Sequence, residues 1–139
     1  MSPDEIARQS AAAMWAEDKA CQHLQVRLES VTPGRAVLAM TVTDVMVNGH
    51  GLCHGGYIFT LADSAFAYAC NSFGQRTVAQ NCQITFLTAG RLGMTLRAIA
   101  EERQRGERSG IYDVSVQDDG GIVVAEFRGH SRTIPGSLL

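Results

Sequence analysis

Three observations predict an α+β domain in which one curled antiparallel sheet of five to six strands wraps around a long central helix. The first is an apolar run over residues 48–74 whose one formally charged side chain is Asp63. The second is a set of short segments in which apolar and polar residues alternate, a pattern typical of half-buried strands. The third is the close spacing of these segments, because short turns join antiparallel strands. We expect a single domain over residues 1–139.

The first element is expected to be a helix over about residues 3–22. Ser2 is a good N-cap, Pro3 suits the first helical position, and Glu5 completes a capping box. The period of the apolar residues then changes from that of a helix to two. A turn at residues 32–34 separates the two strands that this alternation predicts.

The central helix is expected over about residues 55–73. No helix breaker follows Gly56 until Gly74, and a glycine just past the last turn is a common helix stop. Apolar residues lie on nearly all faces of this segment, which indicates a buried helix. A lone carboxylate at Asp63 is therefore costly unless it is paired, hydrogen-bonded or used in chemistry.

Four more alternating segments follow, with turns near residues 88–90, 106–110 and 118–121. The apolar members of these segments share one face of each expected strand: Cys82, Ile84, Phe86, Met94, Leu96, Ala98, Tyr112, Val114, Val116, Val123, Ala125 and Phe127. They supply the inner face of the sheet.

Composition excludes several classes of protein. The net charge of −2 argues against a general nucleic-acid or anionic-membrane binder. The acidic N-terminus does not resemble a signal peptide, and the longest apolar run is shorter than the ~18–20 residues of a membrane span. The four cysteines form no CxxC pair and no disulfide-framework spacing. We therefore expect a cytoplasmic protein with free thiols, which binds neither nucleic acid nor membrane.

The start of the central helix and its carboxylate carry complementary chemistry. Unpaired N–H groups at Gly55 and Gly56 can hold a developing oxyanion, and Asp63 can attack a carbonyl or activate water. Eight residues separate Gly55 from Asp63, which is about 12 Å along a helix axis, whereas acyl transfer needs both groups within about 3 Å of the reacting atoms. A twofold dimer with antiparallel central helices solves this problem, because Gly55 of one copy then faces Asp63 of the other.

Other interpretations of these residues remain open. Asp63 could be a structural group that holds backbone N–H groups or another side chain. His50, Cys53 and His54 could suggest a metal site, but they lie on a glycine-rich loop with no carboxylate nearby, so no metal is expected. Cys53 could be a nucleophile paired with His54, although adjacent residues rarely face each other productively.

Near the C-terminus, Arg128, His130 and Arg132 alternate, so a strand would project all three from one face. Arginine suits phosphate recognition through its planar donors. The alternative is an ordinary solvated strand face.

Several short motifs resemble those of a known family. They are Asn48-Gly49-His50, Cys53-His54-Gly55-Gly56, Leu61-Ala62-Asp63 and the run from Ala65 to Ser72. Together they closely resemble the phenylacetic-acid-degradation (PaaI-type) acyl-CoA thioesterases of the hotdog-fold superfamily, and the resemblance covers about residues 12–134. The fold of that family, a curled sheet around a central helix, is the one that the periodicity predicts.

The resemblance implies roles for individual residues. Asp63 matches the acidic nucleophile or general base, and Gly55 matches the helix-start N–H that polarises the thioester carbonyl. His54 and Asn48 match positions that shape and hydrogen-bond the site. The candidate substrate-binding residues are Gly56, Tyr57, Phe66, Tyr68, Arg128 and Arg132. The three aromatic residues among these are candidate linings of an acyl pocket, with core packing as the alternative.

The implied function is hydrolysis of an aryl-acyl-CoA, such as phenylacetyl-CoA or its ring-hydroxylated derivatives, to the free acid and CoA. No metal or redox cofactor is implied, since coenzyme A is part of the substrate. The resemblance also implies a homodimer with shared active sites, assembled into a homotetramer. Two alternatives are a hotdog-fold enoyl-acyl-thioester hydratase or dehydratase and a non-catalytic acyl-CoA-binding module.

Overall fold

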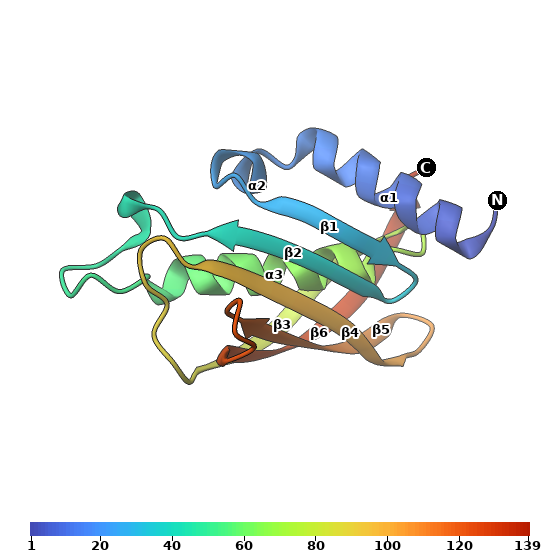
Figure 1. The fold of residues 1–139 in the computed structure, drawn as a ribbon. Coiled ribbons are helices and arrows are strands. Elements are labelled where there is room, and N and C mark those ends of the chain that lie inside the picture. Colours follow the sequence, from blue (N-terminus) through green and yellow to red (C-terminus); the bar gives the residue numbers. More distant parts are fainter.

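The six strands of the chain form one antiparallel sheet that curls around a buried helix (Figure 1). A computed structural model describes all of residues 1–139. In chain order the elements are α1 (Pro3–Glu17), α2 (Lys19–His23), β1 (Arg27–Thr32), β2 (Arg35–Thr41), the short 3-10 helix η1 (Asp44–Met46), α3 (Gly55–Cys70), β3 (Gln75–Phe86), β4 (Thr95–Arg105), β5 (Ser109–Gln117) and β6 (Val123–Ser137). The strand order is β1-β2-β4-β5-β6-β3, which confirms the predicted α+β architecture.

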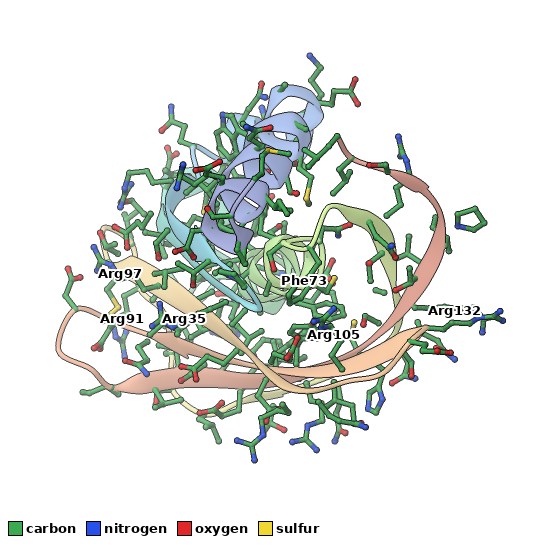
Figure 2. The ribbon with its side chains drawn as sticks, turned by 90° about the vertical axis from the view of Figure 1, so that its right-hand side faces the viewer. Arg35, Phe73, Arg91, Arg97, Arg105 and Arg132 are labelled. Carbon is green, nitrogen blue, oxygen red and sulfur yellow. The ribbon has the colours of Figure 1, made fainter.

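Helix α3 fills the inside of the curl, which is seen end-on in Figure 2. The inward positions of β2, β4 and β5 alternate as the sequence predicts, and many of them are alanine or valine, which lets the helix lie close to the sheet. The buried side chains of α3 that face this sheet or the N-terminal helices are Ile58, Leu61, Ala62, Ala65, Phe66, Tyr68, Ala69 and Cys70. This helix and the sheet therefore share one continuous core.

The N-terminal helix is interrupted, so the prediction of one helix over about residues 3–22 is wrong. Asp18 ends α1 with non-helical backbone angles (φ −84°, ψ 77°) and caps α2. Its Oδ1 accepts the backbone N–H of Cys21 at 3.1 Å, and its Oδ2 accepts the hydroxyl of Tyr68 at 3.0 Å. Aspartate favours such a cap over a helix interior because its short side chain competes for backbone donors.

Helix α3 ends at Cys70, about three residues before the predicted end. The Asn71 side chain ties this end to β3, since it accepts the N–H of Thr77 and donates to its carbonyl, both at 2.9 Å. Gly74 has a φ of +84°, which few other residues adopt, and it completes the turn into β3. The glycine stop is thus real but lies beyond a short non-helical turn.

Gly129 on β6 is the position where the core tolerates no side chain. A Cβ there would lie 2.7 Å from the ring of Phe66, which is 1% exposed and packs against Tyr112 and Phe127. We expect Gly129→Ala to lower the free energy of unfolding by about 1–3 kcal/mol through overpacking. Urea denaturation checks this. Gly49→Ala is the control, because its Cβ meets nothing within 4 Å; equal stability of both variants would contradict the prediction.

Candidate active site

The loop before α3 is organised by Asn48. Its Oδ1 accepts the backbone N–H groups of His50 at 2.9 Å and Leu52 at 3.2 Å. Its side-chain amide nitrogen has no partner within the chain. Asn48 therefore holds the loop in shape with one side-chain atom and leaves a donor free.

His54 caps α3 and decides which backbone donor stays free. Its Nδ1 accepts the N–H of Gly56 at 2.9 Å, and its carbonyl accepts the N–H of Tyr57 at 3.0 Å. As an acceptor, Nδ1 is unprotonated, so the neutral ring carries its proton on Nε2. The Gly55 N–H has no partner and lies at the positive end of the helix dipole. Gly55 is therefore the available donor, while the N–H of Gly56 is already used.

The free donor of Gly55 opens onto a groove of about 510 Å³. The groove is lined by apolar side chains and by the 87–90 turn; the lining residues are Asn48, Leu52, Cys53, Gly55, Ile58, Phe86, Leu87, Thr88, Ala89 and Gly90. A Cβ on Gly55 would come within 2.9 Å of the Phe86 ring, so glycine lets this ring lie over the helix start. The groove thus brings together two of the predicted residues, Asn48 and Gly55.

Asp63 is a half-buried carboxylate on the part of α3 that faces β3. It forms no ion pair and accepts no backbone N–H; its one hydrogen bond within the chain is from the Cys82 thiol, whose Sγ lies 3.8 Å from Oδ1. Burial raises the pKa of Asp63, and the thiol acts in the opposite direction. Of the two structural roles considered for Asp63, its contacts show no held backbone donor and one held side chain, that of Cys82.

Within one protomer the carboxylate and the free N–H stay apart. Asp63 is not among the residues that line the groove beside Gly55, and the two lie eight residues apart on a continuous helix, about 12 Å along its axis. The single chain does not assemble both groups around one reacting atom.

Two of the three aromatic candidates belong to the core. Phe66 and Tyr68 are each 1% exposed; Phe66 packs on Tyr112 and Phe127, and the Tyr68 hydroxyl donates to Asp18. Neither side chain lines the groove beside Gly55, so core packing is the interpretation that the structure supports for both. Tyr57 is half-buried and lies edge-on to the His54 ring, with centroids 6.4 Å apart.

The two arginine candidates differ in whether an acidic side chain pairs with them. Arg128 is held by both oxygens of Asp113, at 2.6 and 2.8 Å, and this pairing lowers the pKa of the Asp113 carboxyl. Arg132 forms no ion pair and points away from the sheet (Figure 2). Both lie on the outer face of β6, as the alternation predicts. Only Arg132 keeps an unpaired charge.

No three or more His, Cys, Asp and Glu side chains gather where they could hold a metal ion. None of the helices combines the length and the apolar character that crossing a membrane requires.

The sequence of this fold matches a known class of enzymes. Residues 50–125, more than half of the chain, match the Thioesterase superfamily. The chain belongs to this superfamily and is a thioester hydrolase.

Three comparisons show which individual proteins this chain resembles. The acyl-coenzyme A thioesterase PaaI of Escherichia coli (strain K12) is 46% identical over 130 residues, which cover 94% of this chain and 93% of that protein. The structure of the E. coli PaaI protein from the phenylacetic acid degradation operon has a TM-score of 0.96 and covers 98% of this chain and 99% of that one, at 46% identity. A Streptococcus mutans UA159 protein, smu.793, bound to acetyl CoA, has a TM-score of 0.77 at 28% identity, with 81% and 90% covered.

Proposed function

We propose that this acyl-CoA thioesterase hydrolyses an aryl-acyl-CoA, such as phenylacetyl-CoA or a ring-hydroxylated derivative, to the free acid and CoA. The observation that carries the proposal is Asp63, a half-buried carboxylate with no cation and no backbone donor to explain it. The apolar groove beside Gly55 suits an uncharged acyl group. The relative from the phenylacetic acid degradation operon supports the aryl class.

In the proposed reaction the thioester oxygen accepts a hydrogen bond from the Gly55 N–H. One such donor typically contributes ~2.7–4 kcal/mol to transition-state stabilisation. Asp63 either attacks the carbonyl carbon itself or removes a proton from a water that attacks. The carbon–sulfur bond then breaks, and CoA leaves as the thiolate and takes up a proton. When water is the nucleophile the acyl group leaves directly as the carboxylic acid, whereas attack by Asp63 first gives an acyl-aspartyl anhydride, which a water molecule hydrolyses to the acid and the free Asp63 carboxylate. Asn48 and His54 border the same oxygen, and no metal or redox cofactor takes part.

A twofold dimer is proposed as the active unit, because it can supply Asp63 from one protomer and Gly55 from the other. Strand β3 pairs only with β6, so its outer edge is free over 12 residues, and Val78 on it is 44% exposed. Such a long exposed edge is a template for a further strand. Pairing of two β3 strands around a twofold axis runs them antiparallel and continues the sheet.

The same axis brings the two α3 helices together. Gly55 lies against Phe86, and Asp63 lies against Cys82, so α3 and β3 run in opposite directions beside one another. An axis that passes near Phe59 therefore places the glycine turn of one copy level with Asp63 of the other. Most residues of α3 left exposed or half-exposed near this axis are small, apart from the half-buried Phe59; the small or short ones are Gly56, Thr60, Asp63, Ser64 and Ala67. The proposed homotetramer contains two such dimers.

For the CoA phosphates, Arg132 is the candidate that we retain. Its guanidinium is exposed and without an ion pair, whereas Arg128 is already neutralised by Asp113. A phosphate at Arg128 would have to compete with a bidentate carboxylate.

A substrate panel tests the proposed reaction and its substrate class. Steady-state kinetics are measured with phenylacetyl-CoA, a ring-hydroxylated phenylacetyl-CoA, benzoyl-CoA, a medium-chain acyl-CoA and an enoyl-CoA. We expect thiol release with kcat/KM at least about tenfold higher for the aryl-acetyl thioesters, which corresponds to about 1.4 kcal/mol. A preference for the aliphatic chain would reject the aryl class. Hydration of the enoyl-CoA without thiol release would reject the reaction.

A further inference from the structure

We propose that Cys82 is a positioning residue for the Asp63 carboxylate, an inference that rests on the proposed function of Asp63. Cys82 projects from β3 toward α3, and its Sγ lies 3.8 Å from Asp63 Oδ1. This thiol is the one hydrogen-bond donor that the protomer offers to the carboxylate. A fixed Oδ1 leaves Oδ2 in a defined direction for the substrate or the attacking water.

The groups around Asp63 single out Cys82. Cys70 on α3 and Cys21 on α2 are the other titratable neighbours, but the Cys70 thiol donates to the Ala67 carbonyl at 3.5 Å and the Cys21 thiol to the Ser64 hydroxyl at 3.3 Å. No Lys, Arg or His side chain forms an ion pair with the carboxylate. Both of the other thiols are thus occupied elsewhere.

The protonation state of Cys82 suits a donor. Burial, followed by the nearby Asp63 charge, raises the pKa of Cys82 to about 11. The thiol is therefore protonated at neutral pH, and its S–H is available to the carboxylate. In return, this hydrogen bond favours the charged form of Asp63 and opposes the effect of burial on its pKa.

The test compares Cys82→Ala, which removes the donor, with Cys82→Ser, which keeps one. Thiol release from phenylacetyl-CoA, or from the best substrate of the panel, is measured from pH 4 to 9. For Cys82→Ala we expect kcat on the plateau of the pH profile to fall about three- to tenfold, while KM changes less than twofold. The acid limb of the profile, where activity declines as the pH falls, should shift upward by up to about one pH unit. Cys82→Ser should restore the limb toward that of the wild type. Cys70→Ala is the matched control, and its limb should not move.

The outcomes separate this inference from the proposed function. If Asp63→Asn is inactive while Cys82→Ala keeps the wild-type limb and kcat within twofold, the role of Cys82 is overturned and that of Asp63 stands. If Cys82→Ser shifts the limb as far as Cys82→Ala does, the effect is one of packing and the role is again overturned. If Asp63→Asn retains full activity, the proposed function itself fails.

Discussion

Replacement of Asp63 with asparagine is expected to lower kcat for thioester hydrolysis by about 10²–10⁴-fold, because the amide can neither attack the carbonyl nor accept a proton from water. The size and shape of the side chain are retained, so KM should change little. Steady-state assays of thiol release measure both constants. A kcat within threefold of the wild type would remove Asp63 from the mechanism.

The same variant should be at least as stable as the wild type. Burial raises the folded-state pKa of Asp63 above its unfolded value, so the folded protein gains stability from the protonated form below the unfolded pKa and loses it as the pH rises through the folded pKa. At pH 8 the wild type therefore carries a buried charge that Asp63→Asn lacks. We expect a higher Tm for the variant at pH 8, a difference that vanishes well below pH 4. A lower Tm at pH 8 would indicate that the carboxylate stabilises the fold.

The pH dependence of catalysis follows from the same shift in pKa. The carboxylate must be charged to act as a nucleophile or base, so kcat/KM should decline as the pH falls through the raised pKa of Asp63. The acid limb is therefore expected above the ordinary aspartate value of about 4. A profile that is flat down to pH 4 would contradict this.

Two inactive variants are expected to restore each other's activity when they form mixed dimers. One variant is Asp63→Asn, and the other is Gly55→Pro, which removes the free N–H. Proline suits the first helical position, and His54 already has the extended backbone (φ −60°, ψ 135°) that a following proline requires. In a mixed dimer one of the two sites combines an intact Gly55 with an intact Asp63.

Co-expression at equal levels should yield about a quarter of wild-type activity, because half of the dimers are mixed and each has one intact site. Both variants carry the same tag, so the whole co-expressed population is purified, and its thiol release per protomer measures this. Gly55→Ala controls for crowding, since it keeps the N–H but adds a Cβ near the Phe86 ring. Mixed dimers without activity would show that Gly55 and Asp63 do not act across protomers.

The periodicity of apolar residues was sufficient to predict the strands and the central helix, because burial on one face leaves a regular pattern in the sequence. The break at Asp18 leaves no such pattern, because it depends on one aspartate that caps α2 and also accepts the hydroxyl of Tyr68, fifty residues away. Phe66 and Tyr68 were equally ambiguous, since an aromatic residue on a buried helix has the same signature in a core as in a pocket.

The features of the candidate site that depend on residues close together in the sequence were predictable, and the contacts between distant segments were not. The glycine pair with a preceding His indicates a helix start, and the spacing to Asp63 follows from helix geometry alone. Cys82 was predicted only as a core residue. Its contact with Asp63 could not be predicted, because it depends on how β3 packs against α3. Likewise, the pairing of Arg128 with Asp113 depends on the register between β5 and β6.

The strand order has a consequence for synthesis of the chain. Strand β3 leaves the ribosome before β4 and β5, yet its one hydrogen-bonded neighbour is β6, the last strand made. Until residues 123–139 emerge, the segment that carries Cys82 and Phe86 has helix α3 to pack against but no strand of its own chain to join, so its backbone hydrogen-bonding groups are unpaired. Nascent chains are thus most exposed to aggregation, or to capture by a chaperone, in the interval between these two strands.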